Sequence, residues 1–494
     1  MSNELLTKNT VTNLAESVEK LAYDPAKATS GIVHIGIGAF HRAHQAVYTN
    51  DLLALGENQW KITAVSLRSA NIRNQMQPQD YIYSVLERSN NEDKISLVGA
   101  IEQVLVAPEN PQRVIDVLAD TSTKVVTLTV TEKGYCRDKS GVHLDLTNPA
   151  VVNDLNNLSA PQSVPGFIVA ACQKRRTTNS KLTIVSCDNL PSNGRVTQAI
   201  VLEFAEQVNP DIAAWIKENV SFCNSMVDRI VPATTEDDIA LASSLLGVQD
   251  NSVVITEPFK QWVIEDNFVN DKPAWDKVGA LFVKEVCVYE DMKLRLLNGS
   301  HSTLAYIGFL MGYDYIHQAV TDPDCHQFVQ LLQKQMLTTL DDVAGVDLPV
   351  YAQSILDRFA NQRVPYKTTQ VACDGSQKLA QRLLKPADIM LTSGQISDPV
   401  ALVIASWCRF LEGRDHQGEN FTVIDPLAET LTKLAVTHKT DEKQQVLAIL
   451  KESGICSAAL LANNSFIEAI TGYLTAIHQN GMQATLKLFL SSLK

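Results

Sequence analysis

The chain has 494 residues, 45% hydrophobic and 20% charged, as in a soluble globular protein long enough for two domains. Its formal net charge of −13 argues against a nucleic acid partner, although a local basic pocket could still hold a small anion. Residues 1–24 resemble neither a secretory signal nor a transit peptide, and no apolar run reaches about 18 residues. The nine cysteines form no CxxC pair, so we expect a cytoplasmic protein with reduced thiols and no membrane span.

Short apolar runs alternate with helical segments in the first half of the chain. We expect strands at 32–35, 61–67, 125–129 and 183–186, and helices at 111–119 and 160–173. This alternation favours a parallel sheet with helices on both faces, which is a doubly wound α/β domain.

A glycine turn, Gly36-Ile37-Gly38, follows the first expected strand and leads into a helical segment. Gly36 would permit the tight turn, and Gly38 would let the backbone approach a pyrophosphate at a helix N-terminus. The GxGxxG pattern is incomplete because His41 stands at the third glycine, so the alternative is a chance pair of glycines at a strand end. On the dinucleotide hypothesis, the residues that cover the cofactor are Ala39, Phe40, His41 and Arg42, with Arg42 contacting the pyrophosphate.

Three histidines lie near this turn, at positions 34, 41 and 44. His41 and His44 have a spacing that could bind a metal on a helix, but no third ligand is evident nearby, so we expect no metal. His34, inside a strand, is expected to be a core histidine.

The second strand ends near Arg68 and carries no acid there. An acid at this position would select NAD, whereas an arginine suits the 2′-phosphate of NADP.

Helical periodicity prevails beyond residue 285. The expected helices are 291–311, 326–340, 348–360, 376–384, 398–412, 426–437, 441–452 and 465–493. We therefore predict a sheet domain over 1–284 and a mainly α-helical domain over 285–494, with the active site in the cleft between them.

One predicted helix carries an amine, an amide and an imidazole. At about 100° per residue, Asn298 lies about 140° and His301 about 80° around the axis from Lys293, so the three can face one cleft. A buried lysine can accept a proton near neutral pH, and its two neighbours can hold a substrate oxygen. The alternative is a chance trio on a solvated face. Arg295 points away, at about 200°, and is expected to pair with Glu290 or Asp291.

The chain resembles a known family over nearly its whole length, the long-chain polyol dehydrogenases, also called the mannitol dehydrogenase family. The segments that carry the resemblance are GIGAFHRAHQAVYT (36–49), TVTEKGY (129–135), SCDN (186–189), MVDRIVP (226–232), EPFKQWVIEDNF (257–268), KLRLLNGSH (293–301) and DGSQKLAQR (374–382). The branch that looks most similar is that of the fructuronate reductases (D-mannonate oxidoreductases), on WVIEDNFVN, PAWDKVGA and DGSQKL. The fold that this resemblance implies is an N-terminal Rossmann-type domain and a helical C-terminal domain.

The resemblance also implies an activity, the NAD-dependent oxidation of a secondary alcohol without metal, with NADP as a possible alternative cofactor. It makes Lys293 the general base, lets Asn298 and Asn189 flank the reacting oxygen, and lets His301 hydrogen-bond the substrate. The turn-forming residues around Asn189 would suit an ordinary turn equally well. Asp228 is implied on the substrate side, with an ion pair to Arg229 as the alternative. Further residues implied for the cofactor are Thr131 and Lys133.

The substrate is the least determined feature. The uronate branch typically has an Arg-His-Arg run before the threonine that leads into DGSQKL, whereas this chain has Pro365-Tyr366-Lys367 there. A carboxylate could instead be held by Lys367, Arg363 or Lys378. We expect interconversion of D-mannonate and D-fructuronate, with mannitol 2-dehydrogenase, tagaturonate reductase and a non-catalytic dinucleotide sensor as alternatives. The sequence does not indicate an oligomeric state.

Overall fold

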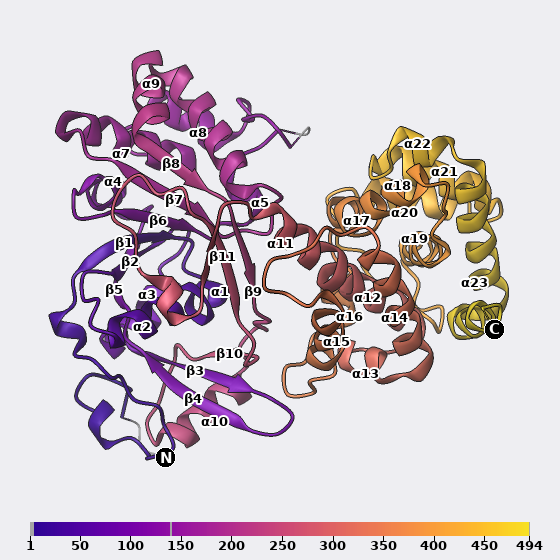
Figure 1. The fold of residues 1–494 in the computed structure, drawn as a ribbon, viewed down its shortest axis with the longest axis horizontal. Coiled ribbons are helices and arrows are strands. Elements are labelled where there is room, and N and C mark those ends of the chain that lie inside the picture. The colour runs from indigo at the N-terminus through magenta and orange to yellow at the C-terminus, as the bar shows by residue number, and fades with distance from the viewer. Residues whose placement is uncertain (1–3, 139–140, 494) are drawn as a thin grey trace. The chain divides into compact units, whose positions relative to one another are not determined.

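The computed structural model describes residues 4–138 and 141–493, and it divides the chain into two compact units, Met1–Cys287 and Val288–Lys494 (Figure 1). The sequence predicted a division after residue 284. Within the described ranges, none of the helices combines the length and the apolar character that crossing a membrane requires.

The first unit is built on a parallel sheet of six strands in the order β5-β2-β1-β6-β7-β8 (Figure 1). The strands are β1 (Ser30–Ile35), β2 (Lys61–Ser66), β5 (Ile101–Val106), β6 (Val125–Leu128), β7 (Leu182–Ser186) and β8 (Val220–Cys223). Every pair in this sheet is parallel. The prediction of a doubly wound α/β domain is confirmed, and the four predicted strands agree with the structure to within a few residues.

Side chains of the central strand alternate between two hydrophobic cores, as the period of a strand requires. Val33 and Ile35 join the core with helices α4 (Pro111–Ala119), α7 (Val164–Thr178), α8 (Asn193–Val208) and α9 (Pro210–Asn219). Ile32 joins the core on the other face, with α1 (Ala39–Ala43), α2 (Gln45–Ala54), Trp262 and Trp275. Because both faces are covered, the strands are apolar almost throughout.

Two small sheets complete this unit, and the sequence did not predict them. One has the order β10-β3-β4 and the other β12-β11-β9. Their strands are β3 (Tyr83–Arg88), β4 (Asp93–Val98), β9 (Ser225–Asp228), β10 (Val254–Thr256), β11 (Gln261–Glu265) and β12 (Leu281–Val283). The remaining helices of the unit are α3 (Asn71–Met76), α5 (Thr131–Gly134), α6 (Pro149–Asn156) and α10 (Glu236–Leu246). Four of these six strands have only three to five residues, too few to show a period.

The second unit is helical, as predicted, and its described residues contain no strand. Its helices are α11 (Cys287–Met292), α12 (Gly299–Leu310), α13 (Ile316–Thr321), α14 (Pro323–Leu337), α15 (Leu348–Phe359), α16 (Thr368–Val371), α17 (Gly375–Leu379), α18 (Lys385–Thr392), α19 (Asp398–Phe410), α20 (Ala428–Thr437), α21 (Glu442–Ser453), α22 (Ala458–Ala462) and α23 (Asn464–Ser491). Nearly every residue of α19 is buried, which identifies it as the central helix of the unit. Two segments are π-helical, η5 (Lys293–Asn298) and η6 (Ala380–Leu384).

Candidate active site

The carboxyl edge of the six-stranded sheet has a reversal of strand order between β1 and β6. The chain runs outward from β1 through β2 to β5 on one side, and then continues on the other side with β6. In open parallel sheets, ligands bind in the crevice at such a switch point. The turn that carries Gly36 follows β1, and Thr129 follows β6, so both lie at this position.

The two glycines of the turn have different surroundings. Gly36 has φ +103°, and a Cβ added there would lie 2.0 Å from the carbonyl oxygen of Thr129. Its N–H donates to the Val65 carbonyl at 2.9 Å. Gly38 is exposed, and the nearest atom to an added Cβ is 4.0 Å away. The tight turn therefore requires glycine at 36, while the open space at 38 fits the approach of a pyrophosphate to the backbone.

His41, at the third glycine position, packs α1 onto β1. Its ring stacks on His34 with the centroids 3.4 Å apart. His34 Nδ1 lies 2.7 Å from Thr127 Oγ1, and Nε2 lies 2.9 Å from Thr129 Oγ1. Burial lowers the pKa of His34 to about 3, so this ring is neutral. The prediction of a core histidine at 34 is confirmed.

The spacing of His41 and His44 had raised the question of a metal. His44 Nε2 lies 2.9 Å from the carbonyl oxygen of Gln261, and its ring stacks on Phe40. Across residues 4–138 and 141–493, no group of three or more His, Cys, Asp or Glu side chains is suitable for holding a metal ion.

Arg42 does not take the expected position at a pyrophosphate. The side chain is buried, its Nη1 donates to the Ser252 carbonyl, and its guanidinium lies 5.7 Å from the centre of the Tyr83 ring. Ser252, far away in the sequence, offers an acceptor to Nη1, whereas the buried Nε of Arg42 has no hydrogen-bond partner among the described residues. Ala39 and Phe40 are half-buried, and Arg68 is exposed just after β2.

Two loops at the carboxyl edge carry further predicted residues. Thr131 and Lys133 are exposed on α5, after β6, and Asn189 is exposed in the loop after β7. The carboxylate of Asp188 joins the loops by accepting the N–H of Thr131 at 2.9 Å and the Tyr135 hydroxyl at 2.7 Å. Asp188 and Tyr135 were not predicted as site residues, although both belong to segments that carry the family resemblance.

Asp228, predicted on the substrate side, is the last residue of β9 and is buried. It lies opposite Gln261 in the antiparallel pair of β9 with β11. Its neighbour Arg229 forms an ion pair with Glu87 and donates to the carbonyls of Glu257 and Ala43. The guanidinium of Arg229 therefore has structural partners other than the adjacent aspartate.

In the second unit, Lys293 and Asn298 open and close the π-helical segment η5. Both are buried, with 7% and 9% of their surface exposed. The N–H of Gly299 donates to the Leu294 carbonyl, five residues earlier, as a π-helix requires. The expected 140° between Lys293 and Asn298 assumed α-helical geometry and is too large here, because a π turn contains more residues than an α turn and so rotates less per residue. The amine and the amide are therefore closer to one face than predicted.

Arg295, also in η5, is buried and pairs with a carboxylate four residues earlier. Its Nη2 donates to Asp291 Oδ2 at 2.6 Å, and its Nη1 lies 3.2 Å from Thr339 Oγ1. The predicted structural ion pair is confirmed. It fixes the outer side of the helix that carries Lys293.

His301 follows on α12 and contacts two aromatic rings. It stacks on Phe359 of α15 with centroids 4.7 Å apart, and it meets the Tyr366 ring edge-on at 5.7 Å. Tyr366 belongs to the stretch in which the sequence differs from the uronate branch, so this stretch lies beside His301. Arg363 and Lys367, on either side of Tyr366, are exposed.

Lys378 lies on α17, and its Nζ donates to the Cys373 carbonyl at 2.7 Å. Nζ also lies 3.9 Å from Asp374 Oδ2. An ammonium has three N–H donors, and the Cys373 carbonyl accepts one of them. A substrate oxygen would therefore be bound by another N–H of the same group.

Arg382, on η6, was not predicted and contacts the lysine helix directly. Its Nη1 donates to Ser302 Oγ at 2.9 Å and lies 3.5 Å from the carbonyl oxygen of Asn298. The two π-helical segments therefore meet through a guanidinium. Arg382 is the last residue of DGSQKLAQR, a segment that carries the family resemblance, and this was the sequence signal that could have identified it.

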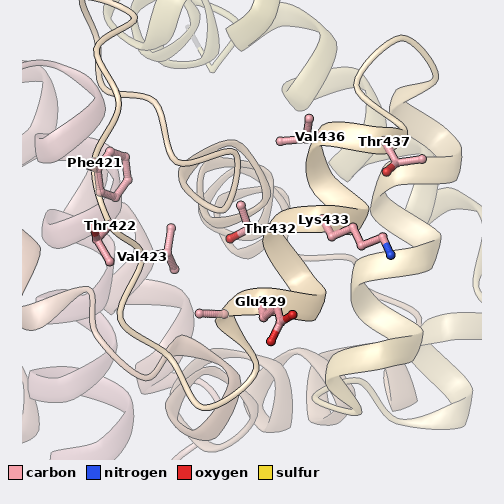
Figure 2. Close-up of a pocket in the computed structure, with 9 residues that line it drawn as sticks. Phe421, Thr422, Val423, Glu429, Thr432, Lys433, Val436 and Thr437 are labelled. Carbon is pink, nitrogen blue, oxygen red and sulfur yellow. The ribbon is translucent and has the colours of Figure 1, made fainter.

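A groove of about 570 Å³ lies elsewhere in the second unit, between residues 421–423 and α20 (Figure 2). Its lining is mainly apolar and includes Phe421, Val423 and Val436, with Glu429 and Lys433 along the helix. None of the residues predicted to act on substrate or cofactor lines it.

Comparison with known proteins gives consistent matches over both units. A family model described as the mannitol dehydrogenase Rossmann domain matches residues 30–277, and one described as the mannitol dehydrogenase C-terminal domain matches residues 285–478. The chain is 42% identical to the D-mannonate oxidoreductase of Escherichia coli (strain K12), over 94% of this chain and 96% of that protein. It is 35% identical to the mannitol 2-dehydrogenase of Aspergillus terreus (strain NIH 2624 / FGSC A1156), over 92% of each. A solved structure of Pseudomonas fluorescens mannitol 2-dehydrogenase, in ternary complex with NAD and D-mannitol, matches with a TM-score of 0.91 and 38% identity, covering 98% of this chain and 99% of that one.

Proposed function

This chain belongs to the mannitol dehydrogenase family, and we propose that, as an NAD-dependent oxidoreductase of secondary alcohols, it interconverts D-mannonate and D-fructuronate. The observation that carries the choice of substrate is its greater identity to a D-mannonate oxidoreductase than to the two mannitol 2-dehydrogenases described above. The space at Gly38 and the switch point between β1 and β6 support a dinucleotide at this edge.

The proposed chemistry needs a proton acceptor and donors to an oxyanion. A bound NAD would supply the acceptor for the hydride that leaves the carbinol carbon. Lys293, which is buried, accepts the hydroxyl proton at Nζ as the general base. Asn298 and Asn189 donate amide N–H groups to the oxygen as it gains negative charge, and His301 hydrogen-bonds the substrate.

A sugar acid also needs a cation for its carboxylate. We assign this role to Lys367 and Arg363, which are exposed on either side of the Tyr366 ring that contacts His301. Lys378 is assigned to the distal hydroxyls, because its ammonium already donates to the Cys373 carbonyl and is only partly exposed. Asp228 is assigned to the substrate side, and Thr131, Lys133 and Arg68 to the cofactor.

A second candidate is mannitol 2-dehydrogenase activity, and one observation favours it. Pro365 and Lys367 stand where the uronate branch typically has arginines, and their neighbour Tyr366 contacts His301. A change of charge at this place would alter the recognition of a carboxylate before it altered hydride transfer.

The first experiment measures oxidation of NADH and NADPH separately, with fructuronate, tagaturonate and fructose as substrates. Turnover with fructuronate but not fructose is the expected result. Turnover with fructose alone would replace the proposal with the mannitol activity, and tagaturonate alone would identify a different sugar acid. Absence of turnover with all three, with NADH still bound, would favour the non-catalytic sensor. Comparing NADH with NADPH tests the role of Arg68.

The second experiment replaces the proposed base. Lys293→Ala is expected to lower kcat by at least about a hundredfold, since general-base catalysis contributes about 10²–10⁴-fold, while NADH binding persists. In the wild type, alcohol oxidation should rise with pH as the amine loses its proton, and ketone reduction should favour lower pH. Lys443→Ala, at an exposed lysine of α21, serves as the control. Unchanged turnover in Lys293→Ala would remove this residue as the base.

A further inference from the structure

The carboxylate of Asp188 holds together two loops that end neighbouring strands. Its Oδ2 accepts the N–H of Val130 at 3.0 Å and the Tyr135 hydroxyl at 2.7 Å, and its Oδ1 accepts the N–H of Thr131 at 2.9 Å. Asp188 itself lies just after β7, whereas its three donors lie in the segment after β6. One side chain therefore fixes both loops at the carboxyl edge of the sheet.

Thr131 has a backbone conformation that its residue type disfavours. Its φ is +63°, in the left-handed region, and threonine is β-branched. Such residues persist only where the surroundings impose the conformation, and they are concentrated at ligand sites. The two backbone N–H groups that Asp188 accepts are those of Thr131 and of the residue before it, so the carboxylate acts directly on the strained turn.

The surroundings of the carboxylate suit this role. The Tyr135 hydroxyl, which is buried, lies between Asp188 and Ser186 of β7 and so ties the carboxylate to the sheet. Asn193 donates its side-chain N–H to the Asp188 carbonyl at 2.9 Å, which fixes the backbone as well. Burial raises the pKa of Asp188, although the three hydrogen bonds oppose the rise.

The strained turn lies next to the glycine turn. Thr129, two residues before Thr131, donates its hydroxyl to the Gly36 carbonyl at 2.7 Å, and its own carbonyl is the atom that excludes a Cβ at position 36. The segment Thr129–Thr131 therefore forms the β6 side of the crevice at the switch point. Asn189 directly follows the carboxylate, in the next loop along the same edge.

We propose that Asp188 is a positioning residue for the dinucleotide: it holds Thr131 in the left-handed conformation, shapes the β6 side of the crevice, and orients the loop that carries Asn189. This inference rests on the proposed placement of the dinucleotide between β1 and β6. Among the residues assigned to the substrate, it involves Asn189 alone.

The test measures the Kd of NADH by fluorescence titration. Asp188→Asn keeps the shape but presents an N–H to at least one of the three donors, so it should raise Kd about tenfold or more. Thr131→Gly makes a positive φ unstrained, and because it also removes a side chain assigned to the cofactor, its own Kd is the reference for the double variant. Adding Asp188→Asn to Thr131→Gly should raise Kd by a much smaller factor than adding it to the wild type, because glycine no longer needs the carboxylate to hold the turn.

Asp154→Asn provides a matched control in the same unit. Asp154 is a buried carboxylate that accepts the N–H groups of Gln162 and Ser163 and the Ser163 hydroxyl, all at 2.6–2.8 Å. This variant should lower thermal stability but leave the Kd of NADH unchanged. If Asp188→Asn does not fold, Tyr135→Phe removes one of the three hydrogen bonds and should raise Kd by a smaller factor.

Three results would overturn the inference: an unchanged Kd in folded Asp188→Asn, an equal rise in Asp154→Asn, or an Asp188→Asn effect that is as large in the Thr131→Gly background as in the wild type. Turnover with the sugar acids is measured separately in the wild type. A wild type that binds NADH but reduces none of them would contradict the proposed substrate, while the pattern of Kd values would still decide the role of Asp188.

Discussion

At the scale of single residues, the turn after β1 shows that two glycines can be required for different reasons. An alanine Cβ at Gly36 would collide with the Thr129 carbonyl, and the φ of +103° would strain it further. An alanine Cβ at Gly38 would meet nothing closer than 4.0 Å in the protein. Gly36 is therefore required by the fold, whereas the need for Gly38 would come from the ligand.

Substitution of each glycine by alanine separates these requirements. Gly36→Ala should lower the free energy of unfolding by more than about 1 kcal/mol, since a side chain is incompatible with that backbone. Gly38→Ala should leave unfolding nearly unchanged and raise the Kd of NADH. Denaturant unfolding and NADH titration of both variants check this. Equal losses of stability, or NADH binding unchanged by Gly38→Ala, would contradict the assignment.

At the scale of elements, the paired π-helical segments are the main departure from regular structure. Arg382 of η6 reaches Ser302 and the Asn298 carbonyl across the contact with η5. π-helical turns inside α-helices occur frequently at functional sites. The guanidinium thus acts on the backbone of the residue whose amide we assign to the reacting oxygen.

Removal of this guanidinium should affect catalysis more than folding. Arg382→Ala should lower kcat by about ten- to a hundredfold, because small displacements of a catalytic group are costly, with a lesser effect on KM. Arg382→Lys should recover part of kcat, since an ammonium can still donate to Ser302. Arg414→Ala, at an exposed arginine of the same unit, should change neither constant. If thermal stability and kcat fall together and lysine restores nothing, Arg382 has only a structural role.

At the scale of the whole molecule, the second unit has a buried charge cluster that makes its stability depend on pH. Glu412, after α19, accepts from His478 Nε2 of α23 at 2.6 Å and from the Gln445 amide of α21 at 3.1 Å. Lys439 Nζ lies 3.3 Å from its other oxygen. Burial alone would lower the pKa of His478, but the hydrogen bonds and negative charges of Glu412 and Glu442 together outweigh it, and the net pKa is raised above 6.5. Burial alone would raise the pKa of Glu412, but the hydrogen bonds from His478 and Gln445 and the nearby positive charges outweigh it. The net pKa is therefore lowered below 4.5.

The signs of these shifts define a range of pH. A raised histidine pKa contributes stability that is fully present below pH 6.5 and is lost as the pH rises through the folded-state pKa of His478. A lowered glutamate pKa contributes stability above pH 4.5 that is lost as the pH falls through the folded-state pKa of Glu412. The cluster should therefore stabilise this unit most between pH 4.5 and pH 6.5.

Thermal unfolding of the wild type and of His478→Gln across this range tests the cluster. The wild type should be the more stable below pH 6.5, and its advantage should shrink as the pH rises above that value. His438→Gln, at a histidine outside the cluster, is the control. A constant difference between wild type and His478→Gln at every pH would show that the histidine contributes packing and not charge.

Some features of the fold and the site could be predicted from local sequence because they depend on neighbours along the chain. The helix 111–119 was predicted with its observed bounds, and the pair Arg295–Asp291 follows from a spacing of four residues. The π-helical turn at Lys293 could not be predicted, since its apolar pattern is compatible with an α-helix. The short strands β9 to β12 also have too few residues to show a period.

By itself, the sequence determined the division into a sheet unit and a helical unit, the strand that leads into the glycine turn, and the family with its Lys293–His301 segment, because periodicity and motifs are local properties. Only the tertiary structure decided which distant groups meet: Arg42 with Ser252, His41 with His34, Tyr366 with His301, and Asp188 with Thr131. The physical reason is that a buried charge or polar group must find a partner wherever the chain brings one, and local sequence does not encode that partner.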